Sequence, residues 1–197
     1  MTGVGPVNRH AVAENANMTE EQPSNSRPFE VEILDKPRNY VSGYSGPSGF
    51  NWLVNGLLGG VSRPGIFHEI RHDVEAIARV GTALLITLNE NWEPPVELLL
   101  EHGVESLHLK IKDLHAPTFA EAIDTCRIVD GYLSQDRVCV YHCRAGVGRT
   151  GTMLAAQLMF YGYSAAEAVF RAREANPKWI ESEVQMQFLR DFEDYLK

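Results

Sequence analysis

The residues whose types and spacing could carry out chemistry lie in a loop between Cys143 and Thr150. The run before it, 138–141, is apolar and rich in β-branched residues, which predicts a buried strand. The stretch after it, 150–161, is rich in Ala, Leu and Met, which predicts a helix. The loop therefore joins a thiol, the guanidinium of Arg149 and the free backbone N–H groups of a helix N-terminus. This combination predicts an anion-binding loop with a nucleophile at its base.

The thiol must first lose its proton, because only the thiolate attacks. Inward-pointing amides, the helix dipole and the Arg149 guanidinium all favour the anion. The same donors would hold the oxygens of a phosphoryl group, with Arg149 as a bidentate partner. Gly146 and Gly148 would let the backbone turn tightly, and Thr150 can donate its hydroxyl to the sulfur and ease its departure. The residues expected to bind the phosphate are Arg144, Ala145, Gly146, Val147, Gly148 and Arg149.

The residues from His142 to Gly151 resemble the signature of the protein tyrosine phosphatase superfamily. They match the pattern His-Cys-x-x-Gly-x-x-Arg-Ser/Thr-Gly at every fixed position. The opening 50–60 resembles that of the atypical dual-specificity phosphatases, and the similarity covers roughly residues 50–195. The resemblance implies a cysteine-dependent phosphomonoester hydrolase with a phosphocysteine intermediate and no metal or other cofactor.

The same resemblance implies roles for two further residues, Asp113 and Gln185. Asp113 lies in a loop after a predicted strand, with Pro117 downstream, which is similar to the general-acid loop of dual-specificity phosphatases. Expulsion of an alkoxide or phenoxide needs such a proton donor, and His115 is the alternative donor in the loop. Gln185 follows a short acidic run and resembles the glutamine that orients the hydrolytic water in tyrosine-specific relatives; an exposed helical glutamine is the alternative interpretation.

The same loop also spells a dinucleotide-binding fingerprint, Gly146-x-Gly148-x-x-Gly151, after a strand and at the start of a helix. It lies too late in the chain for a βαβ continuation. The acidic residue near the required offset, Glu167, falls in a predicted helix. The fingerprint also gives no role to the thiol or the guanidinium, so we favour the phosphate-binding interpretation.

Composition and charge narrow the class of protein. The 197 residues are 44% hydrophobic and 22% charged, as in an ordinary globular protein, and the net charge is −8. An acidic chain without an evident basic groove argues against nucleic-acid partners. No apolar run approaches the length of a transmembrane segment. Three cysteines without framework spacing indicate a reducing compartment. We therefore expect a cytoplasmic, monomeric protein.

The chain divides into a polar, disordered tail over 1–28 and a phosphatase domain over 29–197. Strands alternate with helices in the domain, which predicts the α/β class: a central, largely parallel sheet flanked by helices, as in dual-specificity phosphatases. In such sheets, sites form at the carboxyl ends of the strands. The expected elements are an edge strand 29–34, a hairpin 50–60, strands 83–88, 104–111 and 137–142, and helices 70–80, 95–102, 119–133, 164–176 and 181–195.

The substrate class is left open between proteins and lipids. Phosphotyrosine proteins are the first expectation, with phosphoserine and phosphothreonine as secondary substrates. A phosphoinositide phosphatase is the nearest alternative, because Arg144 adds charge where lipid-acting relatives often carry Lys. Val147, however, stands where those relatives place a second basic residue. A slow phosphopeptide-binding module is the alternative outside the enzymes.

Overall fold

The computed structural model describes residues 46–197. The predicted tail over 1–28 and the predicted edge strand over 29–34 lie outside the described residues. Within them, every predicted strand and helix is present, and most of their ends differ from the prediction by one or two residues. No helix among residues 46–197 is long and apolar enough to cross a lipid bilayer.

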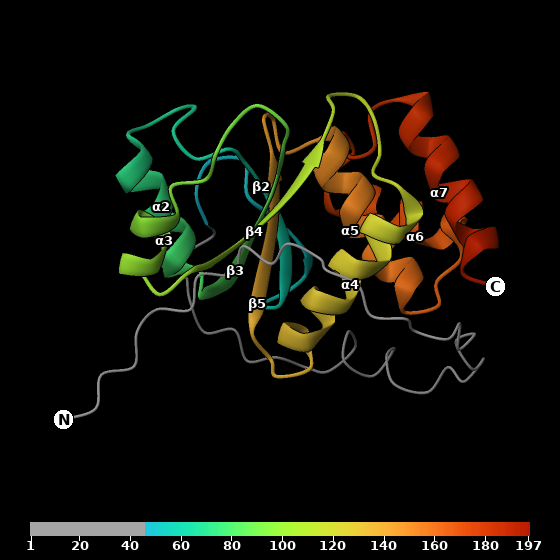
Figure 1. Cartoon of the computed structure of the whole chain (residues 1–197), viewed down its shortest axis with the longest axis horizontal. Coiled ribbons are helices and arrows are strands. Elements are labelled where there is room, and N and C mark those ends of the chain that lie inside the picture. The colour runs from blue at the N-terminus through green and yellow to red at the C-terminus, as the bar shows by residue number, and fades with distance from the viewer. Residues whose placement is uncertain (1–45) are drawn as a thin grey trace, which may run out of the picture.

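A five-stranded sheet forms the centre of the domain (Figure 1). Its spatial order is β1-β2-β5-β3-β4; β1 is antiparallel to β2, and the other neighbours are parallel. The largely parallel sheet predicted from the sequence is therefore confirmed. The strands are β1 Asn51–Val54, β2 Leu58–Ser62, β3 Thr82–Asn89, β4 Glu105–Ile111 and β5 Val138–Cys143.

Helices cover both faces of this sheet, in two unequal groups (Figure 1). The smaller group is α2 and α3, and the larger group is α4 to α7. Parallel strands need crossover connections, and α2, α3 and α4 lie in those between β2 and β3, β3 and β4, and β4 and β5. The helices are α2 Ile70–Arg79, α3 Val96–Glu101, α4 Phe119–Leu133, α5 Gly148–Phe160, α6 Ala165–Ala175 and α7 Glu183–Tyr195.

Alternating side chains on the central strands build two hydrophobic cores. On β5, Cys139, Tyr141 and Cys143 belong to the larger core, which includes side chains of α4 to α7, whereas Val138 and Val140 belong to the smaller core with side chains of α2 and α3. Both sets are buried, which explains why the strand reads as a continuous apolar run. This alternation directs the Cys143 side chain to the α5 face, at the carboxyl end of the strand.

Candidate active site

The loop between β5 and α5 is held by backbone contacts from distant parts of the chain. Gly146 has a φ of 70°, and a Cβ there would lie 2.5 Å from the carbonyl carbon and oxygen of Val61. Only glycine permits this approach without a shift. The indole N–H of the buried Trp179 donates to the Gly146 carbonyl (3.0 Å), and the Arg63 N–H donates to that of Arg144 (3.2 Å). The loop is thus fixed against both β2 and the segment before α7.

Helix α5 begins at Gly148, two residues earlier than the sequence predicts, and it begins without a side-chain cap. Its N-cap residue, Val147, makes no side-chain hydrogen bond to the first turn. The helices α4, α6 and α7 all begin with complete capping boxes instead. The first N–H groups of α5 therefore lack side-chain partners at the end that faces the loop, where a bound oxyanion would satisfy them.

The sulfur-bearing residue, Cys143, is 3% exposed and lines a cleft of about 400 Å³. The cleft also takes in Asp113, Arg149 and Gln185, so the structure brings the predicted nucleophile, acid, cation and glutamine together. Its remaining wall includes the apolar residues Ile66, Phe67 and Leu114. No sequence pattern indicates the first two, since the segment after β2 resembles an ordinary turn. The available signal is a large aromatic residue, Phe67, in the segment that follows the carboxyl end of a strand.

The Arg149 guanidinium is fixed by the ends of the two neighbouring strands. It is 4% exposed, and its Nη1 donates to the Ile111 carbonyl at 2.9 Å and to the Leu88 carbonyl at 3.5 Å. Its Nη2 lies 2.8 Å from Oδ1 of Asp113. The predicted acid and the predicted phosphate-binding cation therefore form an ion pair, in which the carboxylate is mostly exposed and the guanidinium is not.

The loop that carries Asp113, residues 112–118 between β4 and α4, is here called the acid loop. It is attached to the start of α7. The Ser182 hydroxyl donates to the Leu114 carbonyl (2.7 Å), and the Gln185 side-chain N–H donates to the His115 carbonyl (3.3 Å). Leu114 has a left-handed φ of 60°, so the loop adopts a costly backbone conformation that these contacts stabilise.

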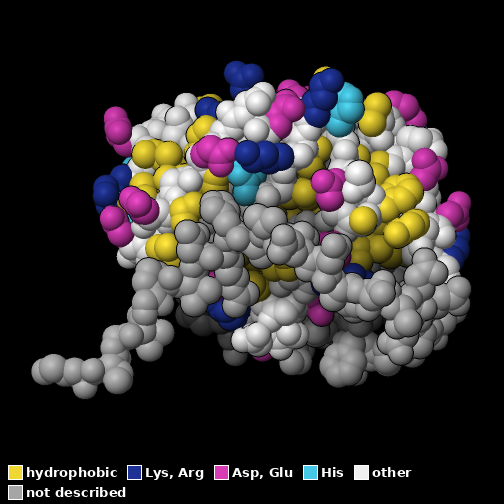
Figure 2. Space-filling model, viewed as in Figure 1, with side chains coloured by type: hydrophobic (Ala, Val, Ile, Leu, Met, Phe, Trp, Pro, Cys, Tyr) yellow, Lys and Arg dark blue, Asp and Glu magenta, His cyan; other side chains and the backbone are white. Residues whose placement is uncertain are grey.

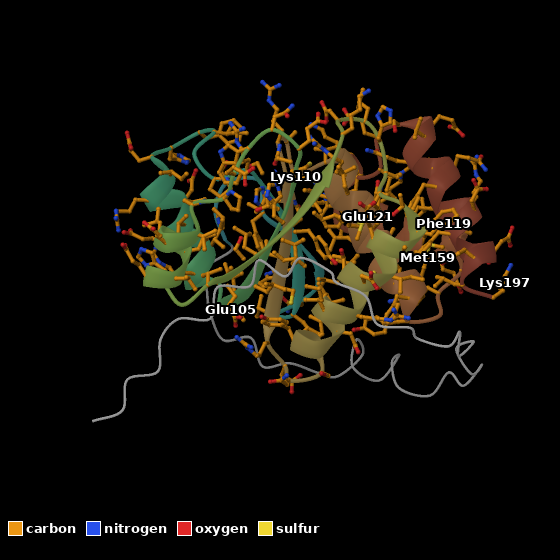
Figure 3. All side chains as sticks on the ribbon, in the orientation of Figure 1. Glu105, Lys110, Phe119, Glu121, Met159 and Lys197 are labelled. Atoms are coloured by element: carbon orange, nitrogen blue, oxygen red, sulfur yellow. The ribbon has the colours of Figure 1, made fainter. Side chains whose placement is uncertain are left out.

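Aromatic packing attaches the other end of this loop. Phe119, labelled in Figure 3, opens α4. Its ring lies 5.5 Å from that of Phe188 and 5.9 Å from that of Phe192. Both partners belong to α7. The acid loop and α7 therefore form one packed unit.

Gln185 is fully buried, in contrast to the alternative interpretation as an exposed helical glutamine. Its amide oxygen accepts the N–H groups of Glu181 (2.9 Å) and Ser182 (3.1 Å), while its amide nitrogen bonds the acid loop. A Cβ at Gly148 would lie 2.9 Å from that nitrogen. Gly148 is thus needed for close approach rather than for an unusual φ, and both ends of the Gln185 amide are occupied by protein groups.

Two residues near the thiol in the sequence, Thr150 and His142, are buried. The Thr150 hydroxyl has no hydrogen-bond partner in the described structure, so its predicted bond to the Cys143 sulfur is not formed here. His142 shares a hydrogen bond of 2.8 Å between its Nε2 and the Thr87 hydroxyl. Burial lowers the pKa of His142 to about 3, so the ring is neutral and structural.

The other cysteines, Cys126 and Cys139, are free and buried in the larger core. Burial raises the pKa of Cys139 to about 12 and that of Cys126 further. Neither thiol is reactive at neutral pH. Among residues 46–197, one group has the donors for a metal ion: His68 and His72 place their Nδ1 atoms 3.1 and 3.7 Å from Oδ1 of Asp73. The cleft itself presents donors for an oxyanion.

The competing dinucleotide interpretation fails on the position of its acidic residue. Glu167 is the third residue of α6 and closes a capping box with Ser164. It does not follow a strand, as the ribose-binding residue of that motif would.

Comparisons with known proteins agree with the site. A family model described as "Polymorphic toxin system, DSP-PTPase phosphatase" matches residues 59–163. Protein tyrosine phosphatase domain-containing protein 1 of Danio rerio is 29% identical over 101 residues, which cover 51% of this chain and 14% of that protein. The Arabidopsis thaliana protein "Phosphatidylinositol 3,4,5-trisphosphate 3-phosphatase and protein-tyrosine-phosphatase PTEN1" is 34% identical over 89 residues, or 43% and 22% of the two chains. The matched part is thus a small fraction of either relative.

Among solved structures, the active form of Tk-PTP is similar with a TM-score of 0.67 and 26% identity, covering 75% of this chain and 97% of that one. The family model spans more than half of the present sequence. This chain therefore belongs to the DSP-PTPase phosphatase family, within the protein tyrosine phosphatase superfamily.

Proposed function

We propose that the chain hydrolyses phosphomonoesters through a phosphocysteine on Cys143. The observation that carries this proposal is one cleft lined by the sulfur, the buried guanidinium of Arg149 and the carboxyl group of Asp113. In the first step the thiolate attacks phosphorus, an S–P bond forms and the ester P–O bond breaks. Asp113 delivers its proton to the departing oxygen, so that the leaving group departs as a neutral alcohol or phenol.

In the second step the Asp113 carboxylate takes a proton from water. The water oxygen bonds to phosphorus, the S–P bond breaks, and phosphate leaves with the thiolate restored. Throughout, Arg149 and the N–H groups of residues 144–149 stabilise the equatorial oxygens, which carry the negative charge of the transferring group. The carbonyls of Ile111 and Leu88 keep the guanidinium oriented for this task before substrate arrives.

Gln185 serves, in this proposal, to position the acid loop. Its amide nitrogen bonds the His115 carbonyl and its oxygen holds the chain at Glu181 and Ser182. The water-orienting role expected from the sequence would require one of these bonds to open during the second step. It stays a prediction.

Phosphotyrosine in proteins is the substrate that this cleft suits best. Ile66, Phe67 and Leu114 give it apolar walls beside the thiol, and Phe67 is 66% exposed before any substrate covers it. An aryl ring buries apolar surface against such walls, which the shorter, aliphatic side chains of phosphoserine and phosphothreonine cannot do to the same extent. These two residues are therefore secondary substrates.

A phosphoinositide is the second candidate, and Arg144 is the observation that favours it. This residue is exposed and lines the cleft beside the thiol, where it could meet another phosphate of an inositol ring. Val147 offers no second cation there. Figure 2 shows acidic and basic side chains interspersed over the visible described surface, without a continuous basic area on that face that would attract an anionic membrane.

The experiment compares three substrates under identical conditions: a phosphotyrosine peptide, the matching phosphoserine peptide and a phosphoinositide in mixed vesicles. We expect the highest kcat/KM for phosphotyrosine and no turnover in Cys143→Ser. Faster turnover of the lipid would overturn the protein assignment. Turnover that survives in Cys143→Ser would overturn the mechanism.

A further inference from the structure

A second hollow of about 280 Å³ adjoins the catalytic cleft. It shares Asp113, Arg144 and Arg149 with the cleft, and its remaining lining comes from the ends of β2 and β3 and the residues after them, including Arg63, Asn89 and Trp92. A group bound there would therefore lie next to the phosphate held by the loop. The mechanism above gives this hollow no role.

The hollow carries positive charge that the protein does not neutralise. The Nε of Arg63 is buried without a hydrogen-bond partner, and its guanidinium lies over the Trp92 ring at 5.4 Å. Neither Arg63 nor Arg144 forms an ion pair within residues 46–197. On a chain with a net charge of −8, these two neighbouring arginines leave a local concentration of positive charge without a carboxylate partner. They constitute a site for an anion.

The carboxylates in the hollow do not cancel this charge. Asp113 is paired with Arg149 at 2.8 Å. Glu90 accepts the backbone N–H of Asp113 at 3.3 Å and is the remaining carboxylate of the lining. Two guanidiniums thus face one carboxylate, and the balance favours an anionic ligand.

Asn89 indicates which kind of molecule the anionic group belongs to. It is 6% exposed, and its side-chain carbonyl oxygen is buried without a partner. A buried acceptor of this kind needs a donor, and the backbone N–H of a bound peptide supplies one. A peptide donor beside an anionic side chain accounts for Asn89 and Arg63 together.

We propose that this second hollow binds a phosphorylated or acidic side chain next to the phosphotyrosine in a peptide substrate. Arg63 and Arg144 hold its oxygens, and Trp92 keeps the Arg63 guanidinium in place. This inference rests on the proposed function, because the peptide must first place its phosphotyrosine on the loop of Cys143. The second anion is bound and not hydrolysed, since no nucleophile lines the hollow.

The test uses two phosphotyrosine peptides that differ only in having Glu or Ala beside the phosphotyrosine. We expect kcat/KM to be about tenfold higher for the Glu peptide, as for one charge-assisted hydrogen bond. Replacing Glu by phosphoserine should raise the preference further, and added salt should lower it. In Arg63→Ala the ratio of the two peptides should fall clearly toward one, with only the part due to Arg144 remaining, and in Arg63→Lys it should be intermediate.

Arg127→Ala is the matched control, because Arg127 pairs with Asp124 on the exposed side of α4; its ratio should equal that of the wild type. A preference that is undiminished in Arg63→Ala, or that does not respond to salt in the wild type, overturns the subsite. Stronger inhibition by inositol bisphosphate than by the doubly phosphorylated peptide overturns its assignment to a peptide. Failure of the proposed function is distinct, because neither peptide nor 4-nitrophenyl phosphate would then be hydrolysed.

Discussion

Replacement of Asp113 by Asn separates its two proposed roles, as proton donor and as partner of Arg149. The variant keeps the shape of the side chain but has no acidic proton to deliver. A general acid contributes about 10²–10⁴ in rate, or roughly 3–5 kcal/mol of transition-state stabilisation. We expect this loss in kcat/KM for phenyl phosphate, whose leaving group needs protonation, and a much smaller loss for 4-nitrophenyl phosphate, whose leaving group departs as a stable anion.

Oxyanion binding should become tighter in Asp113→Asn, although catalysis becomes slower. Asp113 and a phosphate compete for the Arg149 Nη2, and the present ion pair of 2.8 Å must weaken when phosphate binds. Because the Asp113 side chain is 65% exposed, solvent screening limits the pair to about 1 kcal/mol or less. We therefore expect vanadate to inhibit Asp113→Asn up to about fivefold more tightly than the wild type. The bonds from Arg149 to the Ile111 and Leu88 carbonyls keep the guanidinium in place without its partner.

The assay is steady-state kinetics with both esters, with Asp124→Asn on the exposed side of α4 as the matched control. The control should behave as the wild type toward both substrates and vanadate. Equal losses for the two esters would refute the assignment of Asp113 as the acid. Weaker vanadate inhibition in Asp113→Asn would refute the competition for Arg149.

Three further variants test the buried residues and the close backbone contact that hold the site in place. Gly146→Ala places a Cβ against the Val61 backbone at a left-handed φ; urea denaturation should show a loss of about 2 kcal/mol or more in the free energy of unfolding, and kcat should fall as the loop is displaced. Unaltered stability would contradict the close approach. Gln185→Ala should slow phenyl phosphate more than 4-nitrophenyl phosphate if Gln185 positions the acid loop, whereas equal slowing would favour a role in water attack. His142 is neutral when folded, with a pKa of about 3, so below its ordinary pKa of about 6.5 the unfolded chain binds a proton that the folded chain excludes. The free energy of unfolding should therefore fall by about 2 kcal/mol between pH 7 and pH 5 because of this residue. His142→Gln should remove that part of the pH dependence. If stability changes equally with pH in both proteins, His142 is not buried as a neutral ring.

Patterns local in the sequence were sufficient to predict most of the fold. The helix Phe119–Leu133 agrees with the prediction at both ends, and a capping box marks its start. The sequence places the start of α5 two residues too late. Val147 makes no side-chain cap, so the usual helix-start signal is absent there.

The attachments of the site could not be predicted in the same way. The bond from Trp179 to the Gly146 carbonyl spans 33 residues, and that from Arg149 to the Leu88 carbonyl spans 61. Such contacts depend on how the strands and helices pack, and no local pattern encodes them. The burial of Gln185 was missed likewise, because an amphipathic helix does not reveal which neighbour covers its polar residue.

The most direct measurement of the central claim is the mass of the protein during turnover. Asp113→Asn should form the intermediate readily from 4-nitrophenyl phosphate but should hydrolyse it slowly, since the base for the attacking water is missing. Acid quenching followed by peptide mass spectrometry should then find one phosphoryl group on the peptide that contains Cys143, and none in the double variant with Cys143→Ser. Rapid turnover with no phosphorylated cysteine at any time, or a phosphoryl group on another residue, would contradict the account.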